Sequence, residues 1–431
     1  MAEPPNWLNL DHVWLPYAQM ADAPLPLPVV SASGVRLRLA DGREFIDGIS
    51  SWWTACHGYA HPHIVAAVQK QAAQLPHVMF AGLAHEPAYT LAARLAAKLP
   101  GDLGRVFFSE SGSVSVEIAL KMALQYWRNC GEPQRRAVLA FRHGYHGDTF
   151  MTMAVTDPDV GMHEAFRGIV PGALLVDLPR DEASAAALDE LLEREAPRLA
   201  AVIVEPLVQG AGGMRMHDAA TLARLRQACD RHRLLLILDE IMTGFGRTGS
   251  LFACEQACMV PDIVCLSKAL SGGTLPLAAT VAREHVFAAF LGSEFERALM
   301  HGPTFMANAL ACAAANASLD LFEGEPRLAQ VAAIERQLAR ELEPCRALPG
   351  VRDVRVKGAI GVVELDAPAA PLRAAFAERG VWLRPFGNIV YLMPPFVIDT
   401  ADLGTLTAAV REVVGEWSRT GHAAKGSGDV V

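Results

Sequence analysis

The sequence lacks long hydrophobic runs and an excess of basic charge. None of its segments reaches about 18 uninterrupted apolar residues, the length a membrane-spanning helix needs. Its first residues do not place an apolar stretch after a basic one, so they do not predict a secretory signal peptide. The formal net charge is −9 and there is no long Lys/Arg block, which argues against nucleic-acid binding. We therefore expect a cytoplasmic protein that binds neither membranes nor nucleic acid.

Cysteine is sparse, with eight residues in a chain of 431. Most lie inside apolar patterns, where Cys behaves as a small hydrophobic residue, so we expect free thiols and no disulfide framework. Cys254 and Cys258 are four positions apart and are expected on one face of a helix. His143 and His146 have no third ligand at a recognisable spacing, so we expect no metal site.

Apolar residues are abundant, at 52%, whereas charged residues make up only 20%. This balance predicts a large buried interior, an extensive subunit interface, or both, and the length suggests about two to three domains. From about residue 60 to 320, helices alternate with short apolar strands, the pattern of an α/β protein with a mainly parallel, doubly wound sheet. The expected strands are residues 105–108, 137–141, 201–204, 234–238, 263–266 and 277–281.

The two ends of the chain have a different pattern. Val35–Leu39 alternates like a half-exposed strand before an Asp-Gly turn, which predicts a small antiparallel element. After helices near 305–321 and 326–343, a smaller α+β domain is expected. It has strands 351–356, 359–365, 381–383 and 389–392, and helices around 370–379 and 400–417. We assign 1–58 to a segment that contributes to the small domain and the active-site entrance, 59–322 to the large domain, 323–419 to the small domain and 420–431 to a flexible tail.

Two of the buried strands end in an acid and an amine. Leu234–Asp239 delivers Asp239, and Asp262–Lys268 delivers Lys268. Active sites of open α/β sheets lie outside the carboxyl ends of the strands. Enzymes that use pyridoxal phosphate need such a pair, a lysine that holds the cofactor as a Schiff base and an acid that keeps the pyridine nitrogen protonated. Taken singly, each residue is also typical of a strand that reaches solvent.

Small residues follow another of these strands and open a helix at Ser111-Gly112-Ser113. The unpaired N–H groups at a helix amino terminus form a natural phosphate site. Ser111 or Ser113 can equally be a plain N-cap, and the two interpretations are compatible.

Further polar residues follow strands or precede helices. Tyr145 lies in a glycine-rich loop, where its ring could stack on a flat cofactor. Glu205 ends the strand 201–204 and fits either a cofactor pocket or a turn stabilised by a carboxylate. Thr304 can cap the helix that follows it or donate to a phosphate.

Gly244–Gly249 matches the dinucleotide-binding pattern, which would indicate a nicotinamide oxidoreductase. Such a loop opens a helix at once and meets an acid at the end of the next strand. Here Asp262 stands at the start of that strand, so the pattern disfavours this alternative. A non-catalytic interaction protein is a third hypothesis.

Taken together, these motifs resemble the class III pyridoxal-phosphate aminotransferases of fold type I. More narrowly, the chain is similar to the biotin-pathway branch of that family, and Val114-Ser115 in place of the usual Glu-Ala agrees with that branch. The broad match rests on Ser111-Gly112-Ser113, Tyr145 to Asp148, Glu205-Pro206, Asp239 to Gly249, Ser267 to Gly273 and Gly302-Pro303-Thr304. The narrow match rests on Ser51-Trp52-Trp53, His57 to Pro62, Gly112 to Glu117, Gly210 to Met216, His301 to Met306, Arg384 to Gly387 and Tyr391 to Pro395.

The resemblance implies a bound pyridoxal 5'-phosphate and a homodimer with active sites at the subunit interface. Lys268 would hold the cofactor and shuttle a proton, and Asp239 would pair with the pyridine nitrogen. The remaining implied cofactor-binding residues are Gly112 and Ser113 at the phosphate, Tyr145 against the ring, Glu205 in the pocket, and Pro303 and Thr304 from the second subunit.

The resemblance also implies the substrates. Nitrogen would pass from an amino donor to 8-amino-7-oxononanoate, giving 7,8-diaminononanoate; the donor is S-adenosyl-L-methionine in most relatives and lysine in some. Arg384 would clamp the keto acid's carboxylate, a role that suits a bidentate guanidinium. The other implied substrate-binding residues are Tyr17, also expected to be catalytic, Trp52, Trp53, Tyr145, Lys268, Gly302 and Tyr391. A packing role for Trp53 stays open, as does an ω-amino-acid or acetylornithine substrate.

Overall fold

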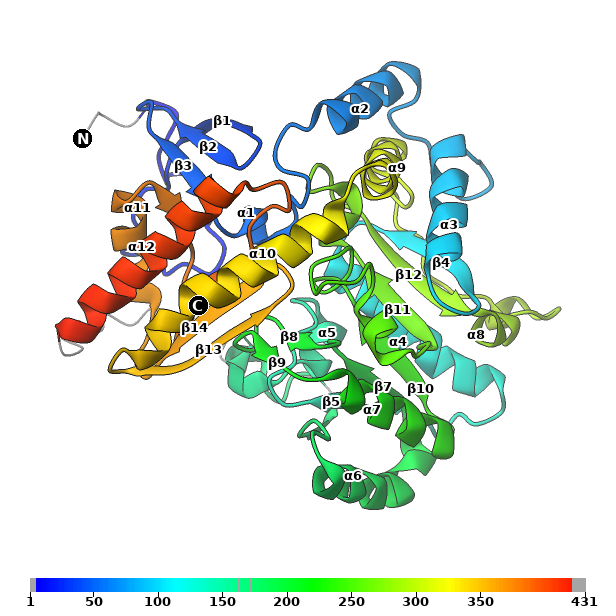
Figure 1. Cartoon of the computed structure of the whole chain (residues 1–431). Helices are drawn as coiled ribbons and strands as arrows, with labels where there is room; N and C mark the ends of the chain where they lie inside the picture. The colour runs from blue at the N-terminus through cyan, green and yellow to red at the C-terminus, as the bar shows by residue number, and fades with distance from the viewer. Residues whose placement is uncertain (1–4, 161–162, 171, 421–431) are drawn as a thin grey trace. The chain divides into compact units, whose positions relative to one another are not determined.

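The computed structural model describes residues 5–160, 163–170 and 172–420, and Figure 1 traces the chain. It divides into two compact units, each described here by itself. Unit 1 comprises Met1–Pro62 with Ala329–Val431, and unit 2 comprises His63–Leu328. The sequence placed the corresponding boundaries after residues 58 and 322. Apart from Thr420, the predicted tail lies outside the described residues.

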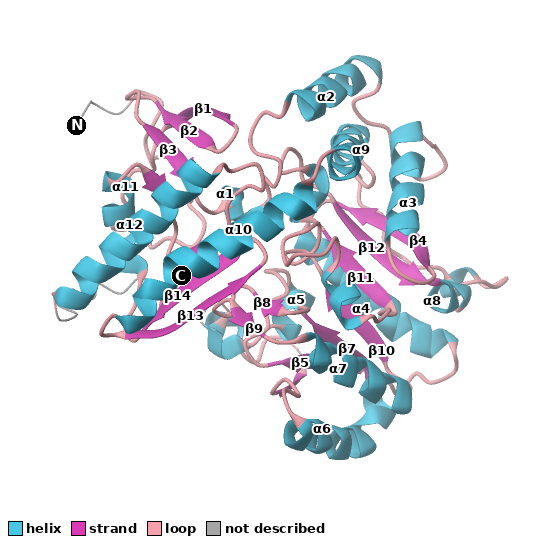
Figure 2. Cartoon of the chain, in the orientation of Figure 1, coloured by secondary structure: helices cyan, strands magenta, loops and turns pink. Residues whose placement is uncertain are grey.

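Unit 2 is built on a seven-stranded sheet of order β4-β12-β11-β10-β7-β5-β6 (Figure 2). Strands β11, β10, β7, β5 and β6 run parallel, and β12 is antiparallel to both of its neighbours, so β4 points the same way as the others. This confirms the predicted mainly parallel α/β sheet. The strands are β4 (Leu103–Ser109), β5 (Ala137–Phe141), β6 (Leu174–Val176), β7 (Leu199–Val204), β10 (Leu235–Asp239), β11 (Ile263–Leu266) and β12 (Ala278–Arg283), with a separate hairpin of β8 (Val208–Gln209) and β9 (Arg215–Met216).

Helix α4 (Gly112–Asn129) covers one face of this sheet and packs on β7, β10, β11 and β12. Alternate strand residues, such as Ile263 and Cys265 of β11, lie in one buried cluster with Ile118 and Leu120 of α4. Burying such an aliphatic side chain is worth roughly 1.5–3 kcal/mol, so this face anchors the strand ends that follow it. The other α-helices of unit 2 are α2 (Pro62–Gln74), which begins at the boundary, α3 (Glu86–Lys98), α5 (Phe150–Val155), α6 (Glu182–Glu195), α7 (Ala219–Arg231), α8 (Glu284–Ala288) and α9 (Ala309–Gly324).

Unit 1 contains two small sheets. In the first, β1 (Val29–Ser33), β2 (Arg36–Leu39) and β3 (Glu44–Asp47) form the expected antiparallel element, and β15 (Val381–Trp382) adds to β3 in parallel. The second is antiparallel, with β13 (Val351–Lys357), β14 (Ile360–Leu365) and β16 (Ile389–Leu392). Its helices are α1 (Ser50–Trp53), α10 (Arg327–Leu342), α11 (Arg373–Glu378) and α12 (Thr400–Arg419). None of the helices in the described part of the chain has the length and apolarity to cross a membrane.

The structure excludes one of the two roles considered for Thr304, and the prediction for Cys254 and Cys258 was wrong. Helix α9 begins at Ala309 and its N-cap is Asn308, whose side chain accepts from the Ala311 amide at 3.1 Å, so Thr304 does not cap it. Cys254 is buried in a short 3-10 turn, whereas Cys258 is exposed and ends that turn with a φ of +48°, so the two do not share a helix face. The free-thiol prediction is confirmed for all eight cysteines.

Candidate active site

The predicted site residues of unit 2 gather at one edge of the seven-stranded sheet. Asp239 is the last residue of β10, Glu205 directly follows β7, and Lys268 lies two residues after β11. Because β7, β10 and β11 are parallel neighbours, their carboxyl ends meet at the same edge. The ends of β4 and β5 lead to Gly112 and Tyr145 at that edge as well.

The carboxylate of Asp239 contacts a histidine, His146, and this pairing was not predicted from the sequence. The Nδ1 of His146 lies 2.8 Å from Asp239 Oδ2, and the amide of Ile241 donates to Oδ1 at 3.1 Å. Both side chains are almost completely buried. From the sequence, His146 was considered only as a possible metal ligand. In the structure its partner is the carboxylate of Asp239. This pairing orients Asp239 so that a carboxylate oxygen can meet a protonated ring nitrogen.

Lys268 has a backbone and an electrostatic environment that set it apart. Its φ is +47°, a left-handed conformation that costs a non-glycine residue about 1–3 kcal/mol and clusters at functional sites. Burial lowers the pKa of the amine to about 8, and the charges of Asp239 and Glu205 oppose that shift. The neutral, nucleophilic amine is therefore far more populated near neutral pH than in an exposed lysine.

Glu205 ties two loops of the site together. Its carboxylate accepts from the amides of Tyr145 at 3.0 Å and Gly210 at 2.8 Å. Burial raises its pKa to about 7, the His146 charge lowers it and the Asp239 charge raises it. The structure thus realises the turn-stabilising alternative, and contact between Glu205 and a cofactor stays a prediction.

The amino terminus of α4 is a candidate phosphate site. Ser111 is the N-cap, since its side chain accepts from the Val114 amide at 3.3 Å, which leaves the first amides of the helix at Gly112 and Ser113 for an anion. The hydroxyl of Ser113 accepts from the amide of Asp148 at 3.2 Å, which joins this candidate site to the Tyr145 loop.

The Tyr145 loop places an aromatic ring beside this candidate site. The Tyr145 hydroxyl donates to Asp148 Oδ1 at 3.0 Å, and its ring stacks on His163 at 6.1 Å between centroids. His163 Nε2 also lies 3.1 Å from Asp148 Oδ1. These contacts restrain the tyrosine ring in one orientation, as a stacking surface for a planar ligand requires.

Gly147 allows the Tyr145 loop to approach α4, and we predict that Gly147→Ala weakens phosphate binding. A Cβ at this position would lie 2.3 Å from Ser113 Oγ and 2.9 Å from Ser113 Cα, and the φ of +131° is itself strained for alanine. The dissociation constant for pyridoxal phosphate, measured by fluorescence titration of the apo-protein, should rise about tenfold or more. Gly131→Ala is the matched control, because Gly131 also has a positive φ but nothing lies within 4 Å of its Cβ. Equal affinities of the two variants would contradict the role of Gly147.

The residues of this edge fit pyridoxal phosphate as a set. Lys268 supplies an amine of lowered pKa for an aldehyde, and Asp239 supplies a carboxylate for the ring nitrogen. The amides of Gly112 and Ser113 suit a phosphate, and the Tyr145 ring suits a flat heterocycle.

Unit 1 brings together the predicted substrate residues that belong to it. The Arg384 guanidinium carbon lies 4.4 Å from the centre of the Trp52 ring, and Tyr17 meets the same ring edge-on at 6.0 Å. Burial lowers the pKa of Arg384, and the charge of Arg373 lowers it further. Arg384 is therefore a partly desolvated cation that gains from an anionic ligand.

Trp53 and Tyr391 are buried against each other, with ring centroids 6.3 Å apart and an interplanar angle of 73°. This is the packing role that the sequence left open for Trp53. Contact of either residue with a substrate stays a prediction.

Gly302, Pro303 and Thr304 lie in a partly exposed segment of unit 2 outside any helix or strand. Lys121 of α4 tethers the start of this segment by donating to the Met300 carbonyl at 2.6 Å. The nicotinamide alternative finds no support, because Gly244–Gly249 forms consecutive turns and does not open a helix.

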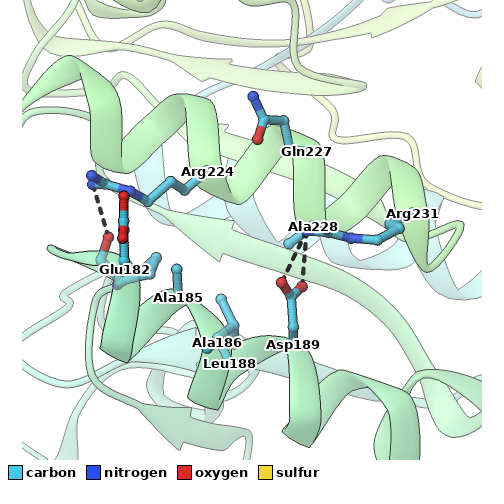
Figure 3. Close-up of a pocket in the computed structure, with 10 residues that line it drawn as sticks. Glu182, Ala185, Ala186, Leu188, Asp189, Arg224, Gln227, Ala228 and Arg231 are labelled. Carbon is cyan, nitrogen blue, oxygen red and sulfur yellow. Dashed lines mark hydrogen bonds and ion pairs between the residues drawn. The ribbon is translucent and has the colours of Figure 1, made fainter.

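A hollow of about 300 Å³ between α6 and α7 is a separate feature (Figure 3). The two arginines that line the hollow already have partners. Arg231 pairs with Asp189 at 3.0 Å, and Arg224 donates to the Arg180 carbonyl at 3.1 Å. None of its lining residues belongs to the loops that carry Lys268, Asp239 or Tyr145. This hollow is therefore separate from the predicted site at the sheet edge.

Comparison with known proteins gives concordant results. Residues 17–414 match the family Aminotransferase class-III. The chain is 48% identical to adenosylmethionine-8-amino-7-oxononanoate aminotransferase of Mycobacterium leprae, over 95% of this chain and 96% of that protein. Its fold is similar to the crystal structure of the enzyme of that name from Methanocaldococcus jannaschii, with a TM-score of 0.90 and 32% identity over 94% and 97% of the two chains. An amine transaminase from an uncultivated Pseudomonas species, solved in its PLP-bound form, has a TM-score of 0.87 and 33% identity over 94% of this chain and 99% of that one.

Proposed function

Because the chain belongs to the class III aminotransferases, which depend on pyridoxal phosphate, we propose that it transfers an amino group to 8-amino-7-oxononanoate and forms 7,8-diaminononanoate for biotin biosynthesis. The proposed amino donor is S-adenosyl-L-methionine, as the names of the relatives indicate. The observation that carries the proposal is the placement of Lys268 and Asp239 at adjacent strand ends, within a chain 48% identical to a named enzyme over 95% of its length.

When bound, pyridoxal phosphate supplies a cationic ring that withdraws electrons from the substrate carbon next to nitrogen. Asp239, oriented by His146, would keep the ring nitrogen protonated. Lys268 Nζ removes a proton from the substrate carbon and returns a proton at the end of the transfer, which its lowered pKa suits near neutral pH. The amides of Gly112 and Ser113 would bind the phosphate of the cofactor during these steps.

The direct test supplies the purified enzyme with 8-amino-7-oxononanoate and each candidate donor, S-adenosyl-L-methionine or lysine, and identifies the diamine by mass spectrometry. We expect diamine with S-adenosyl-L-methionine. Formation of the diamine with lysine but not with S-adenosyl-L-methionine would overturn the donor assignment. No diamine with either donor, combined with consumption of ω-amino acids, would replace the proposed reaction by that of another class III aminotransferase.

We predict that Arg384→Ala weakens binding of 8-amino-7-oxononanoate by about 2–5 kcal/mol, because its carboxylate loses a partly desolvated cationic partner. Isothermal titration of the pyridoxal-phosphate enzyme with this keto acid measures the change. Arg384→Lys is the matched control: it keeps the charge but loses the bidentate geometry, so an intermediate loss is expected. An unchanged dissociation constant for Arg384→Ala would remove this residue from the substrate site.

The uptake of pyridoxal phosphate by the apo-enzyme should depend on the pKa of Lys268. The neutral amine is the reactive form, so the rate should rise with pH through about 8 and level off above it. The rate is measured by stopped-flow absorption from about pH 6.5 to about pH 10, a range that extends on both sides of the expected pKa. N-acetyl-lysine amide is the reference, since its rate should keep rising towards about pH 10.4. A midpoint for the enzyme near that of the reference would contradict the desolvated amine.

We also propose that the enzyme is a homodimer in which Pro303 and Thr304 complete the partner's phosphate site. Unit 2 exposes large apolar side chains beside this segment, including Phe305, which is 57% exposed and whose ring centroid lies 4.7 Å from that of His77, with the rings tilted by 41°. A second exposed group lies around Tyr89, whose ring contacts Phe80. Exposed apolar surface of this kind supports a subunit interface. Sedimentation equilibrium at micromolar concentration should give twice the chain mass, and a monomer with full activity would contradict the shared site.

A further inference from the structure

The turn that carries Trp52 has an unusual backbone. Four successive residues from Ser50 to Trp53 have positive φ values of 50°, 47°, 55° and 75°, and none of them is glycine. For L-residues a left-handed turn brings Cβ close to the following carbonyl, so single residues adopt it at a cost and runs of them are rare. Such a run persists only where its surroundings stabilise it.

A single buried carboxylate supplies much of that stabilisation. Asp47, at the end of β3, is completely buried, and its Oδ1 accepts from the Ile49 amide at 2.8 Å. Its Oδ2 accepts from the Ser51 amide at 2.8 Å and from the Tyr59 hydroxyl at 2.5 Å. The Ser51 hydroxyl in turn lies 2.6 Å from that of Tyr59. The carboxylate therefore binds the amide of the residue before the left-handed turn and the amide of the second residue within it, and is itself oriented by Tyr59.

The turn leads to the proposed substrate-binding arginine through strand pairing. Strand β15 is parallel to β3, with Trp382 opposite Asp47, and Arg384 follows two residues later. The turn after Asp47 thus places Trp52 with its ring 4.4 Å from the Arg384 guanidinium carbon. A guanidinium stacked on an aromatic face has few orientations left, which favours bidentate binding of a carboxylate.

We propose that Asp47 is a positioning residue for substrate recognition: through the left-handed turn it holds Trp52 on Arg384 and so orients the guanidinium for the substrate carboxylate. This inference rests on the proposed function, because it takes Arg384 as the carboxylate-binding group. It assigns no contact between Asp47 and substrate or cofactor.

The test is the kinetics of Asp47→Asn, in which the amide keeps the volume but presents N–H groups where the carboxylate accepts. The KM for 8-amino-7-oxononanoate should rise about tenfold or more, with kcat within about threefold of the parent enzyme. Adding Ser51→Gly to Asp47→Asn should reverse at least half of the increase in log KM, because glycine adopts a positive φ without the Cβ penalty. Trp52→Leu should raise KM similarly, and Asp47→Asn should add less than about twofold in the Trp52→Leu background.

Val413→Ala controls for general destabilisation of unit 1, since it truncates a buried residue of α12 remote in sequence from the turn. It should lower the melting temperature and leave KM unchanged. If Asp47→Asn does not fold, Tyr59→Phe tests the same network with a smaller rise in KM. Three results for Asp47→Asn would overturn the positioning role: an unchanged KM, a fall in kcat as large as the rise in KM, or an effect on KM that is fully additive with that of Trp52→Leu. These outcomes are read only in a parent enzyme that turns over the keto acid, so failure of the proposed function is seen first and separately.

Discussion

Lys268→Ala is expected to reduce aminotransferase activity by at least about 10⁴-fold and to abolish the absorption band near about 420 nm that the cofactor shows when bound to a lysine. Two functions are lost together. The variant lacks the side chain proposed to bind pyridoxal phosphate covalently, which is also the amine proposed to move a proton at the substrate carbon. The lowered pKa of about 8 makes this amine competent for both tasks, and neither Asp239 nor Glu205 can replace it as a nucleophile.

Absorption spectra and kcat/KM with S-adenosyl-L-methionine and 8-amino-7-oxononanoate measure this loss. Lys268→Arg is the matched variant, because it retains the positive charge but cannot be deprotonated to act as a nucleophile or base. It should lose as much activity as Lys268→Ala. A lysine band and substantial turnover in either variant would mean that another amine carries the chemistry.

The sheet and the identity of its key end residues could be predicted because both are local in sequence. The apolar run that becomes β10 ends in Asp239, and the run that becomes β11 is followed by Ser267 and Lys268. Parallel strands place such residues at one edge of the sheet. The short strand β6, of three residues, has too weak a pattern to be recognised. The Ser111 N-cap was one of two options left open, since capping depends on which residue leaves the helical conformation.

The contacts that orient the site could not be predicted, because they join residues far apart in sequence. His146 and Asp239 are 93 residues apart, and their strands β5 and β10 are separated in the sheet by β7. Nothing in the alternation of apolar residues reveals that pair, and the sequence offered no partner for His146 beyond the disfavoured metal site. The same holds for β15, which adds to β3 from the other end of the chain and brings Arg384 to the turn after Asp47.

Asp239→Asn is expected to lower kcat by about 10³-fold while leaving the protein folded. An amide cannot hold a proton on the ring nitrogen, so the ring loses its capacity to delocalise the developing negative charge. The loss should be large because Asp239 is nearly buried, where the charge it presents is weakly screened. The loss should affect kcat more than the binding of pyridoxal phosphate, since the phosphate is proposed to bind independently to the Gly112 and Ser113 amides.

The neighbouring acid supplies the control that isolates this effect. Glu240 is fully buried as well, but its carboxylate accepts from the amides of Ala253 at 2.7 Å and Cys254 at 2.9 Å, and burial raises its pKa to about 7. Glu240→Gln should therefore lower the melting temperature while kcat stays within about threefold. The two adjacent carboxylates at the end of β10 would then have different roles. Asp239 would stabilise the positive charge of the cofactor, and Glu240 would stabilise the loop that follows the strand. Equal losses of kcat in Asp239→Asn and Glu240→Gln would show that Asp239 also acts through the fold.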